Sequence, residues 1–580
     1  TDINTVRGQE TGYATWNPIG ILKESGNTTS TLSDGNLKIT FTSGTNSSNQ
    51  HFSTIGASSG KWYCEWTAEN NPSSNSTAFI FGVQNITDYR DNFLSQTGGY
   101  AWSSINQLWN NGSNTNSWSS GTSATGDTVA LALDLDNSNI TFYRNNIPLG
   151  SALSIPSDKE YAFCMQVYQW QGTPIGTANF GQKPFKYAPP DGFQPLNTAN
   201  KRPETVISLP NQYVGVTTYT GTTGGGTIKD DNILFTPDLV WVKNRSNTED
   251  HKLYDTVRGK SSGNFYNLES NTTAAQAAES GAVTSMIEGG FTSTGGGHVN
   301  SNGVPFVSWM WKAGGSKNTF NVDDVGYASA AAAGLNGGGI TPTGASVGTK
   351  QGFSIIKYTG TGSAATISHG LSSAPACILV KTLDDAYNWF VYHKGTDPNS
   401  PEDYYLKLNT NAARTDSSNA WNDTAPTSTL FTVGTDGSVN ESGDDYIAYL
   451  WQDVPGLQKF GAYEGSGVAG NYVHLGFRPA LLWIKSVDST AIDNWGIIDS
   501  TRSYANVGNH TLATNLNNQE SYFGDGSSVF GSGNKIDLLS DGFRLQETSG
   551  FGNTSGITFL YCAWAEAPSI DLYGGGANAR

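Results

Sequence analysis

One short pattern occurs three times along this chain of 580 residues, and it constrains the fold more than any other feature. A proline is followed by an apolar run and then a lysine, as PDLVWVK at 237–243, PACILVK at 375–381 and PALLWIK at 479–485. An apolar run of this length is typical of a buried β-strand. Each copy is followed by an aromatic segment whose tryptophan lies 74, 76 or 85 residues after the proline. The sequence therefore predicts one β module used three times.

The segments between these landmarks also correspond in order. Each copy is preceded by a glycine-punctuated strand, GVTTYTGT, FSIIKYTGT or FGAYEGSG, and is followed by LESNTTAAQ, LKLNTNAAR or LATNLNNQE. We expect three homologous β-sandwich repeats at residues 205–315, 352–456 and 457–568, with the three proline-to-lysine segments on the same central strand. Residues 569–580 are expected to form a C-terminal tail.

Residues 316–351 separate the first two repeats and differ from them in composition. The segment is rich in Gly, Ala and Ser and contains almost no large apolar residue. Such a composition is typical of a linker or insert, and ASAAAAGL at 328–335 predicts one short helix flanked by flexible connection. Repeats two and three, by contrast, follow each other directly. We therefore expect modules in a row, with a stiffness that differs along the chain.

The overall composition agrees with an all-β chain and excludes two classes of partner. Only 14% of residues are charged, and 69 glycines punctuate the apolar runs, which is typical of turn-rich β structure. The formal net charge of -17 repels phosphate backbones and anionic membrane surfaces, so we expect no nucleic acid partner. No apolar run approaches the roughly 18 residues of a membrane span, so we also expect no membrane insertion.

Residues 1–200 precede the repeats and form a domain of another kind. GDTVALALDLDNSNITFYRNN at 126–146 alternates apolar and polar residues on both sides of a polar turn, which indicates a β-hairpin. Together with GKWYCEW at 60–66 and ANFGQKPFKYAPPDGFQPLN at 178–197, this hairpin resembles a SPRY domain over residues 13–197. The resemblance implies a bent β-sandwich whose loops bind partners.

The order of the later motifs resembles the virion appendage proteins of tailed bacteriophages from marine environments. The resemblance rests on PDLVWVKNRS, LYDTVRG, LESNTTAA, NVDDVGYASAAAAGLNGGGITPTGAS and the terminus DLYGGGANAR, and it covers nearly the whole chain. It implies a structural protein of the virion, in a tail fibre or another surface appendage, that forms a homotrimer and contacts other tail or capsid proteins. A host cell-surface glycan or protein is the ligand that such a location implies.

Several strings match catalytic or cofactor motifs but lack the required context. GSGVAG at 465–470 fits the dinucleotide pattern, yet a strand is expected after it where the motif requires a helix. GASSG at 56–60 fits a nucleophile elbow around Ser58, but it also leads into a strand. The seven histidines lack the spacing of a zinc site, and His298 is expected to be an ordinary exposed histidine. We expect no enzyme activity, no cofactor and no metal.

Adjacent acidic residues and cysteines predict no chemistry either. Glycoside hydrolysis needs two carboxylates that face each other across a cleft, whereas sequence neighbours on a strand point to opposite faces. A pair assembled from distant loops stays open, so a polysaccharide-degrading tailspike is one alternative, and a capsid or tail decoration protein without a host ligand is another. The cysteines are expected to be buried free thiols, although a disulfide between Cys64 and Cys164 is geometrically possible.

Aromatic residues are the remaining candidates for ligand contact. Tryptophans at the repeated strand positions, such as Trp451, are expected in the core. Tyr89, Trp109, Trp118 and Trp170 lie in polar, Asn/Ser/Gly/Gln-rich stretches of the first domain, where loops are expected. Exposed aromatic residues are enriched at binding surfaces. We therefore predict that these four residues contact the host cell surface in a structural component of a tail fibre or similar appendage.

Overall fold

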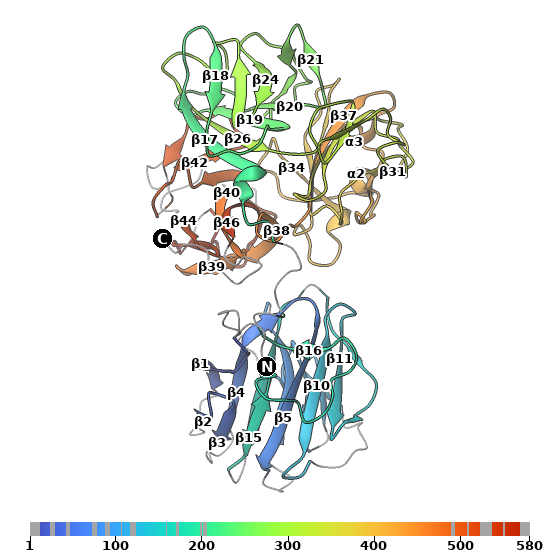
Figure 1. Cartoon of the computed structure of the whole chain (residues 1–580), viewed down its shortest axis with the longest axis vertical. Coiled ribbons are helices and arrows are strands. Elements are labelled where there is room, and N and C mark those ends of the chain that lie inside the picture. Colours follow the sequence, from blue (N-terminus) through green and yellow to red (C-terminus); the bar gives the residue numbers. More distant parts are fainter. Residues whose placement is uncertain are drawn as a thin grey trace. The chain divides into compact units, whose positions relative to one another are not determined.

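The chain folds into two compact units, Thr1–Pro203 and Glu204–Arg580. Both units are built from β-sheets joined by turns, and the second also contains two one-turn helices, α2 (Ser418–Trp421) and α3 (Gly437–Asn440) (Figure 1). The all-β fold class predicted from the sequence is confirmed. The computed structural model describes residues 12–568 apart from 24–29, 42–46, 72–77, 88–92, 106, 116–122, 158, 170–172, 198–199, 201–205, 489–493, 507, 509, 523–535 and 549–550.

The first unit is a sandwich of two sheets. One sheet has the strand order β1 (Trp16–Lys23), β4 (Ser47–Ala57), β14 (Tyr161–Gln169), β6 (Ala78–Asn85), β7 (Gly99–Ser103), β8 (Leu108–Asn110) and β9 (Ser113–Thr115). The other has the order β12 (Ile147–Pro148), β11 (Asn139–Arg144), β10 (Thr128–Asp134), β5 (Lys61–Asn70), β15 (Ile175–Asn179), β3 (Lys38–Phe41) and β2 (Ser30–Ser33). The short strands β13 (Leu153–Ser154) and β16 (Gln194–Pro195) pair with β11 and β5.

The predicted hairpin of residues 126–146 is formed by β10 and β11, which pair from Val129 with Arg144 to Asp134 with Asn139. Its turn is braced by Asp134, whose carboxylate accepts a hydrogen bond from the backbone N–H of Asn137. Every residue of β10 is buried. Val129, Leu131 and Leu133 point into the core between the two sheets. Ala130 and Ala132 point to the other face, where Phe185 and Phe193 of the segment after β15 cover them. The hairpin is therefore part of the scaffold of this unit.

The second unit contains the same five-strand order three times, once in each predicted repeat. In each repeat the strand containing the proline-to-lysine segment occupies the middle position, as predicted. The orders are β17 (Val214–Thr220), β26 (Pro305–Trp311), β19 (Leu239–Asn244), β20 (Lys252–Asp255), β23 (Asn267–Leu268); β30 (Phe353–Thr359), β37 (Asp445–Trp451), β32 (Cys377–Thr382), β33 (Phe390–His393), β34 (Tyr404–Lys407); and β38 (Gln458–Glu464), β46 (Thr558–Pro568), β40 (Phe477–Ser486), β41 (Gly496–Asp499), β42 (His510–Ala513).

The strand register is also repeated. In each repeat the closing tryptophan pairs with the second residue after the proline. The pairs are Trp311 with Leu239, Trp451 with Cys377 and Trp564 with Leu481. A second, smaller sheet covers the other face in each repeat. These sheets are β18 (Gly226–Lys229), β25 (Gly290–Ser293), β24 (Val283–Ile287); β31 (Ala365–Ser368), β36 (Leu430–Val433); and β39 (Asn471–His474), β45 (Gly542–Leu545), β44 (Ile536–Leu539).

The three repeats share one core instead of standing in a row. The largest cluster of buried apolar residues draws members from all three large sheets. At its centre lie Trp311, Trp451 and Trp564, the closing tryptophans of the three repeats, with ring centroids 6.1, 5.5 and 5.9 Å apart. These nearly equal distances indicate a pseudo-threefold axis, and Figure 1 shows the green, yellow and red parts of the unit arranged around a common centre. The expectation of separate modules in series is therefore wrong for the repeats.

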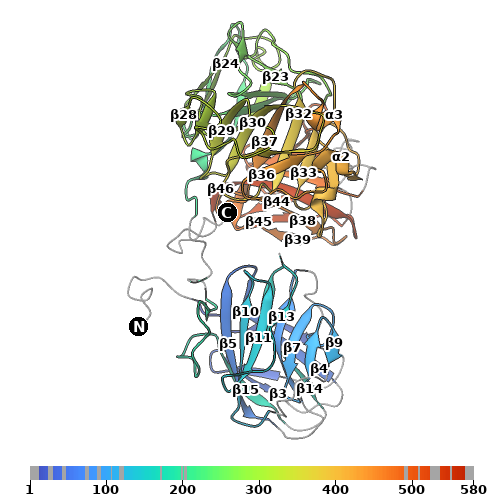
Figure 2. The same ribbon diagram turned by 90° about the vertical axis from the view of Figure 1, so that its right-hand side faces the viewer.

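The segment 316–351 is a packed insert, and the predicted short helix is not formed. It contributes β27 (Phe320–Val322), β28 (Val325–Tyr327) and β29 (Gly344–Gly348), and β29 pairs along its whole length with β30, the first strand of the second repeat (Figure 2). Residues 328–335 form turns, with Ala330 and Leu335 buried against the sheet. The flexible connection was expected from the Gly, Ala and Ser content, but Phe320, Leu335 and Ile340 of the segment are buried in the core beside the sheet.

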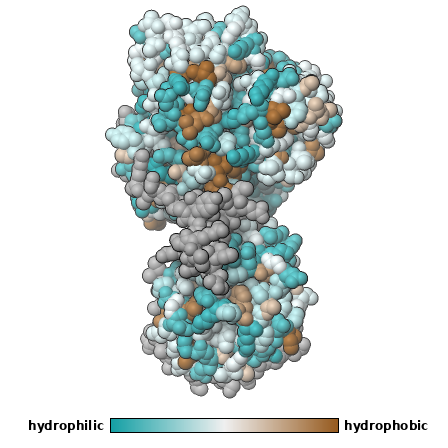
Figure 3. Space-filling view, viewed as in Figure 1, coloured by the Kyte–Doolittle hydropathy of each residue, from teal (hydrophilic) through white to brown (hydrophobic). Residues whose placement is uncertain are grey.

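On the face of the second unit visible in Figure 3, apolar residues form several separate patches among hydrophilic ones. Single exposed apolar residues of this kind are ordinary on a protein surface. None of the described helices has the length and apolar character needed to cross a membrane.

Candidate functional site

Of the four aromatic residues predicted to contact a ligand, the structure describes one. Trp109 lies on β8, the strand next to the edge strand β9, and is half-buried, because it packs on the small cluster that includes Leu94 and Cys164. It is therefore a strand residue with one part of its surface open, whereas a loop residue was expected. Tyr89, Trp118 and Trp170 lie outside the described residues. That these residues contact a ligand stays a prediction.

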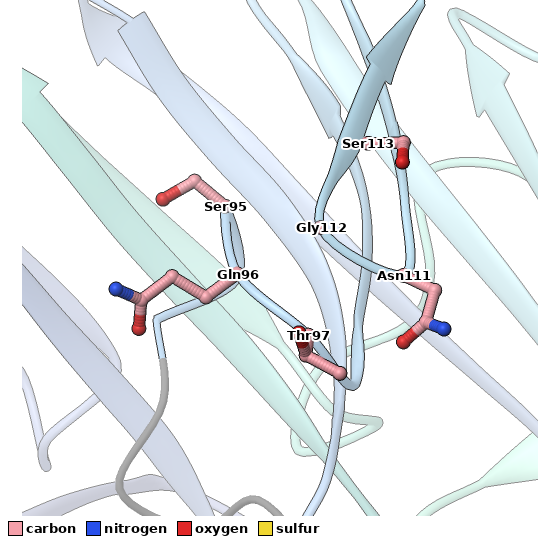
Figure 4. A pocket seen from close by; sticks show the side chains of 6 residues that line it. All are labelled: Ser95, Gln96, Thr97, Asn111, Gly112 and Ser113. Atoms are coloured by element: carbon pink, nitrogen blue, oxygen red, sulfur yellow. The ribbon is translucent and has the colours of Figure 1, made fainter.

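A polar hollow of about 600 Å³ lies in the same part of the first unit as Trp109. Two segments form it, the stretch that leads into β7 and the turn between β8 and β9, and Figure 4 shows them side by side. The lining residues are Ser95, Gln96, Thr97, Asn111, Gly112 and Ser113. All six are uncharged, and five of them carry a hydroxyl or carboxamide group.

The turn between β8 and β9 depends on two residues that accept a left-handed backbone. Asn111 has φ 51° and Gly112 has φ 80°, which is the combination that an Asn-Gly hairpin turn requires. A Cβ atom on Gly112 would lie 2.8 Å from the backbone nitrogen of Thr97. Only glycine therefore lets the turn approach the other wall of the hollow so closely.

Both carboxamide groups of the hollow are held in place by the backbone. The side-chain oxygen of Asn111 accepts a hydrogen bond of 2.8 Å from the N–H of Gly98, and that of Gln96 accepts one of 3.1 Å from the N–H of Phe93. Because each oxygen is engaged by the backbone, the NH₂ group of each carboxamide is held in a fixed orientation as a donor. The arrangement is thus prepared for ligands that accept hydrogen bonds.

Buried amides on the outer face of the first sheet support the same segment from below. The backbone N–H of Leu94 donates to Oε1 of Gln50 at 2.6 Å, and that of Ser95 donates to Oε1 of Gln166 at 3.2 Å. Gln84 donates from Nε2 to the carbonyl of Thr97 at 3.2 Å. Gln50, Gln84 and Gln166 are almost fully buried on β4, β6 and β14, so the central strands of the sheet determine the position of the hollow.

The three lysines of the repeated pattern are the most unusual titratable groups of the second unit. Lys243, Lys381 and Lys485 are completely buried, and burial lowers the pKa of the first two to about 8. Each ammonium group donates to the carbonyl of the next residue, at 2.7, 2.9 and 2.5 Å respectively. Lys243 and Lys381 also donate to loop carbonyls, that of Asn247 at 3.4 Å and that of Asp385 at 3.1 Å, so they join the end of the central strand to the loop that follows it.

The remaining motifs occupy structural positions. Ser58 lies in the bend between β4 and β5, and the glycines of 465–470 lie between β38 and β39, so neither string precedes a helix. The four cysteines are buried free thiols, as predicted. His298 is bound through Nδ1 to Glu249 at 2.6 Å. Within the described part of the chain, His, Cys, Asp and Glu side chains form no group that could hold a metal ion.

The hollow was missed by reasoning from the sequence. The Asn-Gly pair at 111–112 is a hairpin signal and could have placed the turn between two short strands. Nothing in the sequence indicates that the turn packs against residues 95–97, because that contact follows from the order of strands in the sheet. Two of the three supporting amides, Gln50 and Gln166, are likewise separated by 44 and 71 residues from the backbone groups that they bind.

Comparison with known proteins gives one family and several similar solved structures. A family model described as "Domain of unknown function (DUF7483)" matches residues 209–568. The SPRY domain of human HERC1 is 16% identical, with a TM-score of 0.24, and the match covers 29% of this chain and 99% of that chain. A second human SPRY domain is 12% identical, with a TM-score of 0.21, and the match covers 28% of this chain and 98% of that chain. No curated protein matches the sequence.

Proposed function

The chain belongs to the family described as Domain of unknown function (DUF7483), and we propose that this member is a structural component of a bacteriophage tail fibre or similar virion appendage that contributes to attachment to the host cell surface. In this proposal the second unit is a rigid body and the first unit carries the contact site. Other tail or capsid proteins of the particle are its structural partners.

The observation that carries the proposal is the uncharged, braced hollow, one wall of which begins two residues after the half-buried Trp109. Carboxamide NH₂ groups donate to oxygen acceptors, such as the hydroxyl oxygens of a sugar. A charged ligand would find no counter-charge among the six lining residues, and the net charge of -17 repels anions. These features favour a neutral cell-surface glycan over a charged protein segment as the ligand.

Binding of the purified full-length chain to host cells tests this proposal. Asn111→Gly removes the carboxamide and keeps the left-handed turn, so we expect weaker adhesion by a chain that remains folded. Asn146→Gly is the matched control, because Asn146 has φ 69° in the exposed turn between β11 and β12. It should bind like the original chain.

Equal binding by both variants and the original chain would remove the hollow from the contact site. Failure of the original chain to bind host cells would favour a decoration protein without a host ligand. Release of oligosaccharides from host polysaccharide would favour the alternative of a polysaccharide-degrading tailspike. Soluble neutral glycans that compete with cell binding would support the proposed ligand class.

A further inference from the structure

The three repeats of the second unit are joined by equivalent hydrogen bonds that run in a closed cycle. In each case a backbone N–H in the segment after the fifth strand of one repeat donates to a carbonyl just after the buried lysine of the next. The three bonds are Gln276 to Leu383 at 3.1 Å, Arg414 to Val487 at 2.7 Å and Glu520 to Arg245 at 2.8 Å. The first repeat thus bonds to the second, the second to the third and the third back to the first.

A second set of contacts follows the same cycle. A ring nitrogen at the start of the fourth strand of each repeat bonds to a backbone carbonyl of the preceding repeat. The three contacts are Trp389 Nε1 with the oxygen of Glu269 at 2.8 Å, Trp495 Nε1 with that of Lys407 at 2.9 Å and His251 Nε2 with that of Ala513 at 2.9 Å. With the three central tryptophans, these contacts cover the inner face of every large sheet.

The charged groups at the equivalent positions differ from one junction to the next. Glu520 of the third repeat accepts hydrogen bonds from Arg245 of the first repeat at 2.7 Å and from Arg502 of its own repeat at 3.1 Å. Arg414 of the second repeat instead pairs with Asp488 of the third at 3.2 Å and with Asp397 of its own repeat at 2.9 Å. The equivalent residue of the first repeat is the neutral Gln276. The same backbone hydrogen bond is therefore made by a residue with a neutral side chain in the first repeat, a positive one in the second and a negative one in the third. These residues are Gln276, Arg414 and Glu520.

This difference distinguishes correct from incorrect pairing of the repeats. If the second repeat took the place of the third at the last junction, Arg414 would face Arg245. If the third repeat took the place of the second, Glu520 would meet Asp488. Like charges placed together in a partly buried junction are unfavourable, so each wrong pairing is penalised while the right one gains an ion pair.

We infer that one chain closes this ring by itself, and that Glu520 with Arg245 is the lock that joins the last repeat to the first. The second unit is then a single-chain counterpart of a trimer, and its inner faces are covered without contributions from other chains. The resemblance to phage appendage proteins implies a homotrimer. In this unit, three repeats of one chain take the place of three chains. The inference does not depend on the proposed attachment function.

Hydrogen exchange of the full-length chain gives a direct test, because each junction contains one reporter amide, that of Gln276, Arg414 or Glu520. Arg245→Glu places a second carboxylate beside Glu520 and should accelerate exchange at the Glu520 amide by about tenfold or more, since a charged hydrogen bond is lost. The other two amides should change little. Arg245→Lys keeps the charge and should stay close to the original chain.

A matched change at another junction checks the assignment. Asp488→Lys should accelerate exchange at the Arg414 amide and leave that of Glu520 unchanged. If Arg245→Glu and Arg245→Lys gave the same exchange rate at the Glu520 amide, the ion pair of Glu520 with Arg245 would not be what joins the last repeat to the first. The ring itself is tested on the unaltered chain, because the melting temperature of an intramolecular ring does not depend on chain concentration. A melting temperature of the second unit that rises with concentration would show that the junctions form between chains, and would overturn the inference.

Discussion

At the scale of single residues, Gly112 determines the shape of the candidate site. Its left-handed backbone is required by the turn, and its missing side chain is required by the neighbouring backbone. Gly126 offers a matched comparison, since it has φ 92° but no heavy atom within 4 Å of an added Cβ. Substitution of Gly126 therefore reports the loss of stability that comes from the left-handed backbone alone. Substitution of Gly112 adds the loss that comes from steric crowding.

We predict that Gly126→Ala destabilises the first unit by about 1 kcal/mol, the usual cost of a left-handed alanine. Gly112→Ala should cost about 1–3 kcal/mol more, because the new methyl group must displace the wall of the hollow. Denaturant unfolding of the full chain, followed through the transition of the first unit, measures both. Equal costs would mean that the two walls are not packed as described.

At the scale of elements, the closing strands carry the core of the second unit. Trp451 on β37 is 1% exposed and lies within 6.1 Å of Trp311 and 5.9 Å of Trp564, ring centroid to centroid. The three rings meet edge to face, which is a favourable geometry for aromatic groups. One side chain therefore supports the packing of three sheets.

We predict that Trp451→Ala lowers the free energy of unfolding of the second unit by about 3–5 kcal/mol, as for other large buried aromatic residues. Because the core is shared, calorimetry of the full chain should show one transition for all three repeats, displaced as a whole. If the transition divided and only one part moved, the repeats would be independent modules.

The insert shows where strand patterns lose their predictive power. Periodicity identified β19, β32 and β40, because apolar runs of β-branched and aromatic residues specify buried strands. It failed for β27, β28 and β29, which are only three to five residues long and lie in a segment rich in Gly, Ala and Ser. The first strand β30 of the second repeat would otherwise have an open edge, and pairing with β29 satisfies its backbone groups. This stabilisation depends on the neighbouring strand and leaves no mark in the segment's own composition.

At the scale of the whole molecule, the second unit contains three buried histidines in the same state. Burial lowers the pKa of His393 to about 3, that of His369 to about 4 and that of His251 well below its usual range. In each ring Nδ1 accepts a hydrogen bond, from the N–H of Gly395, the N–H of Leu371 or Nε1 of Trp241. All three rings are therefore neutral in the folded chain.

Acid should consequently destabilise the second unit. Between pH 6.5 and about 4, the unfolded chain binds protons at these histidines and the folded chain does not, so stability falls as the pH falls. Each histidine contributes about 1.4 kcal/mol per pH unit. Denaturant unfolding across this range measures the slope, and His393→Gln should reduce it by that amount. An unaltered slope in His393→Gln would contradict the assignment.

The sequence by itself determined the all-β class, the three repeats and their central strands, because these depend on local periodicity and on spacing that is visible along the chain. The tertiary structure decided what the repeats do with their apolar faces. Each sheet has an inner face that only two other sheets can cover, so closure into a ring depends on contacts such as that of Glu520 with Arg245, which are 275 residues apart. The hollow of the first unit has the same origin. Its walls meet because the order of the strands brings residues 95–97 against the turn at 111–112, and no property of either segment alone specifies that meeting.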